Sequence, residues 1–333
     1  MLSKKNIIIL LFQVLFCYSI FDHTQDLKIS SSTYIASLNT ENLYNFYNPA
    51  CNGLNENKYL YSSYGSHFDG ILKNQSIYFS INSNSFKKIN FSIIRSSIDD
   101  IYNTTSAWND NGDGIIDVSE IDYDNITTFS HNTIGFIISK SFSLKNKYKI
   151  LPSFLASKLQ YGFNSKFSFS SVASERSFSH SFDLGAVYYS SKFSDSNWIS
   201  NIGLLVKDLF PYSYWSTGQI ENKESLIIFG SSFGFKNNFS KSKSNYFYFS
   251  SDFNLSDLKN PSIGFEYQFE GYNSLISCQI NSSNIENSLG FILRFKNQLN
   301  ISYAFIIPQN SELSPSQKIM IGINRDILNN YIK

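Results

Sequence analysis

The chain has 333 residues, of which 42% are hydrophobic and only 16% are charged, and its 27 basic and 26 acidic residues leave a formal net charge of +1. The 31 Phe and 22 Tyr exclude a disordered chain, three cysteines are too few for a disulfide-rich scaffold, and the charge balance gives no reason to expect nucleic acid as a partner. Ser, Asn, Tyr and Phe take the place of charged residues, which make up about 25% of a typical soluble domain. This mixture suits a wall with lipid on one side and water on the other.

The first predicted element is a secretory signal peptide over residues 1–21. A start that contains two lysines precedes a mostly apolar run, which is the layout of a signal peptide; a retained anchor helix is the alternative. No small-residue box marks the cleavage site. The exported chain is then expected to keep Cys51 and Cys278, whose wide spacing predicts neither a disulfide nor a metal site.

Residues 22–57 form the second predicted element, a short N-terminal segment. Leu43, Tyr44, Phe46 and Tyr47 follow roughly helical spacing, and the run stops at Pro49. The segment is too short to be a domain of its own. Because the lumen of a wide barrel is an open channel unless something fills it, we expect this segment to be a plug.

From about residue 58 to residue 333 the sequence consists of runs in which apolar and polar residues alternate. Leu289, Phe291, Leu293 and Phe295, for example, fall on one face, and small or hydrophilic residues fall on the other. No run after residue 21 is long enough for a membrane-spanning helix. The expected fold is therefore all-β, a transmembrane antiparallel β-barrel of about 14 strands. A soluble surface β-protein is the alternative, if the apolar faces are buried against one another.

We expect strands near 58–66, 71–82, 87–97, 131–143, 147–162, 179–191, 197–208, 223–236, 245–255, 261–270, 273–281, 286–296, 298–307 and 315–326. Long connections are predicted at 97–130, 164–178 and 210–222, and short turns at the other end of the wall, as in outer-membrane barrels. Several aromatic residues near strand ends are expected in girdles at the membrane interfaces: Tyr59, Tyr61, Tyr64, Tyr188, Tyr189, Tyr246, Tyr248 and Trp198.

The first long connection contains a motif with the spacing of a calcium-binding loop. Calcium prefers six to eight oxygen ligands, and this run can supply them. Gly114 stands at the tight turn. The candidate ligands are Asn109, Asn111, Asp113, the carbonyl of Ile115, Asp117 and a bidentate Glu120. A solvated acidic loop that matches the spacing by chance is the alternative. If the ion binds, it orders an outer loop and performs no catalysis.

No constellation in the sequence points to an enzyme. His180 precedes a serine, but serine is so abundant that this neighbourhood carries little information, and His67 and His131 stand alone. No glycine-rich phosphate loop follows a predicted strand. We therefore expect neither a catalytic residue nor a cofactor beyond the candidate calcium ion.

The residues 26–29 and 41–50, the latter ending in Asn48, Pro49 and Ala50, resemble the N-terminal region of PorV/PorQ-type outer-membrane proteins of the type IX secretion system. These proteins belong to the wider FadL-like β-barrels, whose plug carries an Asn-Pro-Ala motif. Further similar segments follow in the family's order at 182–188, 203–209, 264–267 and 301–305. PorP/SprF proteins are a second choice, because Cys51 replaces the glycine that usually follows the motif.

The resemblance implies a bacterial outer-membrane protein that binds exported cargo proteins and passes them to a surface attachment complex, together with other secretion-system subunits. The competing function is a FadL-like uptake channel, in which a hydrophobic small molecule passes the plug and leaves sideways into the lipid bilayer. An uptake channel predicts an apolar pocket beside residues 43–50, whereas a cargo shuttle predicts an exposed groove among the long loops.

Overall fold

A computed structural model of the protein describes residues 48–53, 59–83, 87–108, 120–143, 159–189, 198–222, 224–240, 243–255, 257–272, 274–283, 286–296, 298–310 and 312–324. The predicted signal peptide and the expected helix before Pro49 lie outside these residues. Within them, no helix is long and apolar enough to cross a membrane.

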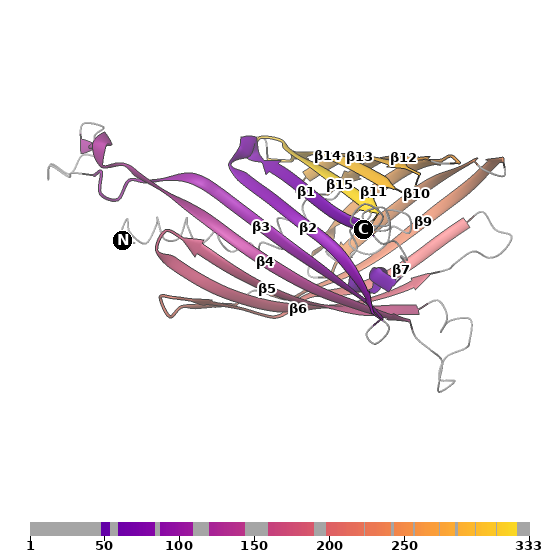
Figure 1. The fold of residues 1–333 in the computed structure, drawn as a ribbon, viewed down its shortest axis with the longest axis horizontal. Helices are drawn as coiled ribbons and strands as arrows, with labels where there is room; N and C mark the ends of the chain where they lie inside the picture. The colour runs from indigo at the N-terminus through magenta and orange to yellow at the C-terminus, as the bar shows by residue number, and fades with distance from the viewer. Residues whose placement is uncertain are drawn as a thin grey trace, which may run out of the picture.

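The described residues form one antiparallel sheet of 15 strands (Figure 1). The strands are β1(Tyr59–His67), β2(Leu72–Ser83), β3(Lys87–Asn103), β4(Thr127–Ser143), β5(Leu159–Val172), β6(Glu175–Tyr189), β7(Trp198–Trp215), β8(Ile220–Asn222), β9(Leu226–Ser240), β10(Lys243–Asn254), β11(Asp257–Glu270), β12(Ser274–Ser282), β13(Glu286–Phe295), β14(Leu299–Pro308) and β15(Ser316–Asn324). Three short 3-10 helices accompany them: η1(Pro49–Gly53), η2(Phe68–Gly70) and η4(Tyr123–Asn125).

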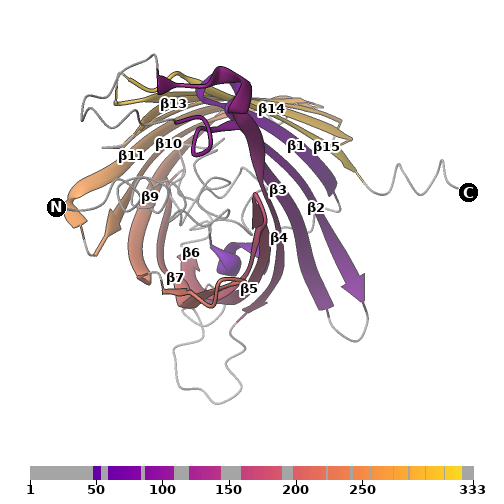
Figure 2. The ribbon, with the colours of Figure 1, turned by 90° about the vertical axis from the view of Figure 1, so that its left-hand side faces the viewer.

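The sheet closes on itself. From β1 to β7 and from β9 to β15, each strand pairs with the next one in sequence. Strand β7 also pairs with β9, and β1 pairs with β15, while β8 pairs only with β7. All strands except β8 therefore form a closed wall of 14 strands around a lumen (Figure 2). The predicted fold class and strand number are confirmed. Among the described strands, closure pairs both edges of all 14 strands of the wall along at least part of their length, as a wall in lipid requires.

The two ends of the barrel differ. The start of β1 and the end of β15 meet at one end, where Tyr59 pairs with Asn324, and we call this end the inner rim. The opposite end, the outer rim, carries the connection at 104–126 between β3 and β4. An even number of strands places both ends of the sheet at the same rim, and in outer-membrane barrels that rim faces the periplasm.

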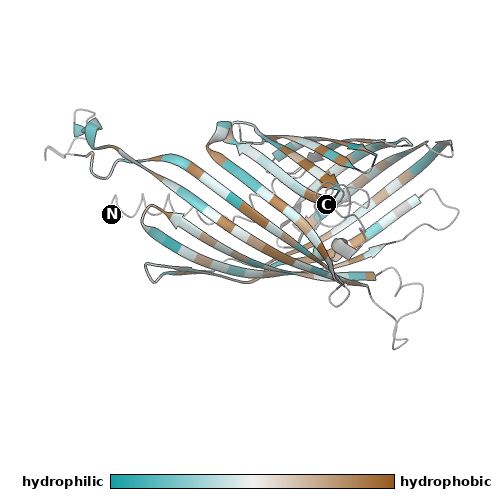
Figure 3. Cartoon of the chain, viewed as in Figure 1, coloured by the Kyte–Doolittle hydropathy of each residue, from teal (hydrophilic) through white to brown (hydrophobic). Residues whose placement is uncertain are grey.

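The two faces of the wall divide by chemistry, as the alternation predicts. Along β13 the side chains of Leu289, Phe291, Leu293 and Phe295 are exposed on the outside, and Arg294 is buried on the lumen side. The same pattern recurs around the barrel, so apolar and polar residues alternate along each ribbon (Figure 3). The apolar faces are not buried against one another, and the alternative of a soluble β-protein is therefore wrong.

Strand length varies around the barrel. The strands β3 to β7 have 14 to 18 residues, whereas β12 to β15 and β1 have only 9 or 10. The β3–β4 hairpin projects beyond the rest of the outer rim in Figure 1. The wall is therefore tall on one side and low on the other.

The predicted loops are only partly correct. The connection predicted at 97–130 is shorter, at 104–126, because β3 and β4 extend further toward the outer rim than predicted. The predicted loop at 164–178 is wrong: these residues belong to β5 and β6, which are joined by a two-residue turn. Residues 210–222 are the end of β7, a turn and β8. The predicted strand start at 147 lies outside the described residues.

The expectation of aromatic girdles also needs correction. Trp198 is exposed at the inner rim and stacks on Phe233, with ring centroids 4.8 Å apart, as a girdle residue does. Tyr61, in contrast, is buried on the lumen side, and its ring lies across Gly322 of β15. The sequence shows that Tyr61 lies near the end of a strand. Which face of the wall it occupies depends on the register of β1.

Candidate functional site

A tight turn of chain lies inside the barrel wall, formed by Asn48, Pro49, Ala50 and Cys51. Asn48 and Ala50 are completely buried, and η1 packs against β4, β5 and β6 (Figure 2). The Asn48 side chain accepts a hydrogen bond from the Ala50 N–H (3.0 Å), and the Asn48 carbonyl accepts one from the Cys51 N–H (3.0 Å). Asparagine caps the turn and proline presets its first φ angle, which explains the motif.

The turn rests on two glycines that face each other across β5 and β6. Gly162 pairs with Gly185, and both face the lumen. A Cβ atom at Gly162 would lie 2.4 Å from the carbonyl oxygen of Pro49, and one at Gly185 would lie 1.9 Å from Oδ1 of Asn48. Only glycine, which has no side chain, therefore fits at these two positions. We call Gly162 and Gly185 the glycine seat. The Asn48 amide also donates to the Leu204 carbonyl of β7 (3.3 Å).

A buried group of charges lies next to this seat. The Lys166 ammonium on β5 contacts the carboxylates of Asp183 on β6 (2.6 Å) and Asp208 on β7 (2.5 Å). Each of the three side chains is 1% or 2% exposed. Burying a charge is costly unless it is paired, and removing one partner leaves that cost uncompensated. We call these three residues the ion cluster.

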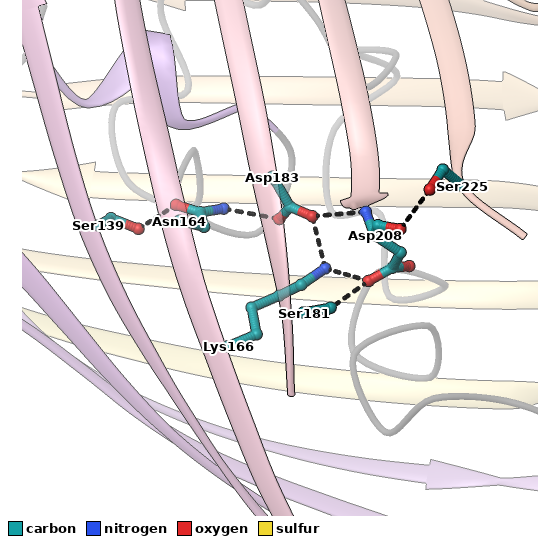
Figure 4. A network of polar contacts seen from close by, with 7 residues as sticks. All are labelled: Ser139, Asn164, Lys166, Ser181, Asp183, Asp208 and Ser225. Atoms are coloured by element: carbon teal, nitrogen blue, oxygen red, sulfur yellow. Dashed lines mark hydrogen bonds and ion pairs between the residues drawn. The ribbon is translucent and has the colours of Figure 1, made fainter. Parts of the chain in front are cut away.

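Hydrogen bonds extend the ion cluster across four strands (Figure 4). Asn164 donates to Asp183 (3.0 Å) and accepts a hydrogen bond from Ser139 of β4. Ser181 donates to Asp208 (3.0 Å). The network thus ties β4, β5, β6 and β7 together on the lumen side.

The ion cluster coincides with an irregular part of β7. Between the pairs Phe182–Leu209 and Leu184–Val206, two residues of β7, at positions 207 and 208, oppose the single residue Asp183. A second bulge follows immediately, between Leu209 and the pair of His180 with Tyr212. Strand β7 pairs with β9 only as far as position 207 and then with β8. The wall is therefore discontinuous here.

The backbone at the two bulges is held in part by the same side chains. Asp208 has a φ of +54° and Phe210 one of +50°, a conformation that residues other than glycine rarely adopt. The Asp208 N–H donates to Asp183 (3.0 Å), and Ser225 donates to the Asp208 carbonyl (2.7 Å). The ion cluster therefore stabilises the strained turn of β7.

The predicted site residues fall into two groups. The structure places Asn48, Pro49 and Ala50 together on the glycine seat. The calcium candidates from Asn109 to Asp117 lie outside the described residues, and only Glu120 is described; it is buried. Trp108 and Ile121, on either side of the motif, pair in a short antiparallel bridge, which brings the two ends of the loop together.

Other candidates do not form a site. His180 faces outward from the wall, among Phe178, Phe182, Tyr212 and Tyr214. In the described part of the chain, no group of three or more His, Cys, Asp or Glu residues is arranged to hold a metal ion. The ion cluster and the glycine seat were not singled out from the sequence.

Neither a family model nor a curated protein matches the sequence. Solved structures do. The chain is similar to the toluene transporter TodX of Pseudomonas putida (9% identity, 88% of this chain and 93% of TodX covered, TM-score 0.44) and to the monoaromatic hydrocarbon channel CymD (9%, 84% and 90%, 0.42). It is also similar to the KdgM porin in complex with disordered oligogalacturonate (6%, 80% and 98%, 0.31). These neighbours are channels and porins, not enzymes.

The closed barrel with its apolar outside and polar lumen identifies the environment of the protein. Antiparallel barrels of this kind span the outer membrane of bacteria, with lipid against the apolar band and water or protein in the lumen. The chain is a bacterial outer-membrane β-barrel, as expected.

Proposed function

We propose that the protein is a FadL-like uptake channel that carries a small hydrophobic molecule across the outer membrane, and that the turn from Asn48 to Cys51 belongs to a plug in its lumen. The observation that carries the proposal is the double bulge of β7, which lies beside the turn. A bulge interrupts the hydrogen-bond ladder and bends the strand. This part of the wall is therefore suited to release a ligand sideways.

The outer surface around the bulge supports a sideways exit. Leu204 and Phe210 of β7, Phe182 of β6 and Ile227 of β9 all expose their side chains there. A molecule that leaves at the bulge, between β6 and β7, would pass directly from the lumen to lipid. Because transfer of apolar surface out of water is favourable, this route suits a hydrophobic ligand and not a hydrophilic one.

The role in type IX secretion rests on the sequence resemblance alone. A cargo shuttle was expected to offer a groove among several long loops, but the predicted loop at 164–178 is a strand pair with a two-residue turn. Purification of the tagged protein from membranes in mild detergent, followed by mass spectrometry, distinguishes the two functions. Bound sortase subunits or secreted proteins with a shared C-terminal domain would favour the shuttle; bound lipid-like molecules would favour uptake.

The transport proposal predicts that deletion of Lys207 stops uptake. Without this residue Asp208 opposes Asp183 directly, so the first bulge becomes a regular ladder and the side exit is lost. The measurement is the uptake of labelled toluene and of labelled oleate by bacteria without their own channel for these compounds. The protein should raise uptake, and the deletion should return it to the level of cells without the protein.

The control for this experiment is Lys318→Met. Lys318 is also buried and faces the lumen, but it lies on β15, away from the bulge. This variant should transport like the unchanged protein. Uptake that never exceeds the empty host, or that survives deletion of Lys207 in a folded barrel, would refute the proposal.

We also propose that the loop before Glu120 binds calcium. The Trp108–Ile121 bridge supports this, because it brings together the two ends of the candidate loop. Terbium, which replaces calcium, should give luminescence excited through Trp108. Glu120→Gln removes the bidentate ligand and should weaken terbium binding by roughly 10-fold or more, whereas Glu312→Gln, in another connection, should leave it unchanged. Equal binding by both variants would refute the assignment.

A further inference from the structure

The glycine seat and the ion cluster occupy successive rungs of the same strands. Gly162 pairs with Gly185 on one rung, and Asn164 pairs with Asp183 on the next. Lys166 stands on the third rung, and every one of these residues faces the lumen. The rung of Asn164 and Asp183, which contains one member of the ion cluster, therefore directly follows the rung of glycines that seats the turn, and its two side chains are hydrogen-bonded to each other.

Strand β7 contacts both features. Its Leu204 carbonyl accepts the hydrogen bond from Asn48, and its Asp208, four residues later, belongs to the ion cluster. The chain from Leu204 to Asp208 includes the first bulge. A shift of Asp208 therefore moves the backbone that holds the Asn48 side chain.

Lys166 is the group that holds Asp208 in place. Its single nitrogen lies 2.6 Å from Asp183 and 2.5 Å from Asp208, so the two carboxylates face each other across it. Without the ammonium group, two like charges would remain close together in a buried place and would repel each other. Asp208 would then move away from β6, which would break the hydrogen bond from its N–H to Asp183 that supports the strained φ.

We propose that Lys166 is a positioning residue that couples the seating of the plug turn to the bulge of β7. With Lys166 paired, the bulge is held against β6 and the turn is bound; when the pairing is lost, β7 moves and the turn is released. The inference deepens the proposed uptake function, because it makes the plug and the side exit change together. Coupling between two sites is reciprocal, so seating the turn also stabilises the ion cluster.

Cys51 is a natural reporter for this coupling. Its side chain is 2% exposed and lies in the turn itself. In a chain with Cys17→Ser and Cys278→Ser, the rate of maleimide labelling of Cys51 measures release of the turn. Labelling of the otherwise unchanged protein should be slow. Lys166→Met should increase the rate by roughly 10-fold or more, since an unpaired buried charge strongly favours release.

Two variants separate coupling from general loosening. Lys166→Arg keeps a positive charge between the two carboxylates and should label more slowly than Lys166→Met. Lys318→Met removes another buried lumen lysine, on β15, and should leave Cys51 protected. Slow labelling of Lys166→Met, or fast labelling of Lys318→Met, would overturn the inference. Each variant is first tested for a folded barrel by its mobility in an unheated detergent gel, because only folded protein is compared.

A double-mutant cycle gives a second, independent test. Gly185→Ala displaces the turn directly, so Lys166→Met should add little to the labelling rate in that background. If the two substitutions increase the labelling rate independently, so that the rate of the double variant shows the product of the two increases, the coupling is refuted. Labelling needs no ligand. If the protein transports nothing while labelling follows the expected pattern, the uptake proposal fails and the coupling stands.

Discussion

Alanine at position 185 should expel the turn from Asn48 to Cys51 and open the lumen. The new Cβ would lie 1.9 Å from Oδ1 of Asn48 and 3.0 Å from Cδ of Pro49, and Asn48 is completely buried, so neither atom has space to move. Overpacking of this kind costs about 1–3 kcal/mol, and release of the turn relieves it. The measurement is single-channel conductance in planar bilayers. Openings should be rare for the unchanged protein and frequent for Gly185→Ala.

Gly162→Ala should have the same effect, because its Cβ would lie 2.4 Å from a backbone oxygen of Pro49, which cannot rotate away. Gly271→Ala is the control: Gly271 lies in the β11–β12 connection, where the nearest atom to a Cβ would be the Ser274 hydroxyl at 3.2 Å. Its conductance should match that of the unchanged protein. If both seat variants stay as closed as this control, the turn does not block the lumen.

Loss of the Asp183 carboxylate should strongly destabilise the barrel. Asp183→Ala removes a partner of Lys166 and the acceptors of Asn164 and of the Asp208 N–H at once. Breaking a buried ion pair by removing one partner costs about 3–5 kcal/mol, because the other charge remains buried. Urea unfolding of the protein in lipid vesicles measures the free energy of unfolding directly.

The exposed pair of Lys73 and Asp99 offers a matched control. These side chains also form an ion pair, at 3.0 Å, but they are 42% and 39% exposed. Solvent screens such pairs, so Asp99→Ala should leave the free energy of unfolding almost unchanged. Equal effects of Asp183→Ala and Asp99→Ala would mean that burial of the ion cluster contributes nothing to stability.

The barrel could be predicted from the sequence because its signal is local. Alternation with a period of two specifies a strand and its faces within one segment, as in β13, and 14 such segments close a wall. The error at 164–178 has a physical reason. Serine alternates with phenylalanine there, at Phe167, Phe169 and Phe178. The high serine content is typical of a loop, but the alternation is that of a strand.

The site was predictable only in part. The motif of Asn48, Pro49 and Ala50 is contiguous in sequence, so it could be found. The ion cluster is not: Lys166 and Asp208 are 42 residues apart, and only strand register brings them together. A signal did exist, since a charged residue at an inward position of a largely uncharged strand needs a buried partner. With residues 164–178 assigned to strands, pairing such positions across neighbouring strands would have found Lys166 and Asp183.

The difference in wall height has a consequence for the surrounding membrane. A strand of 9 or 10 residues, as in β12 to β15, only just spans the apolar thickness of about 25 Å when tilted, whereas β3 to β7 exceed it. Lipids adapt to such mismatch by local thinning. We expect the bilayer to be compressed beside β12 to β15, so that the head groups of the outer leaflet there stand level with the mouth of the lumen.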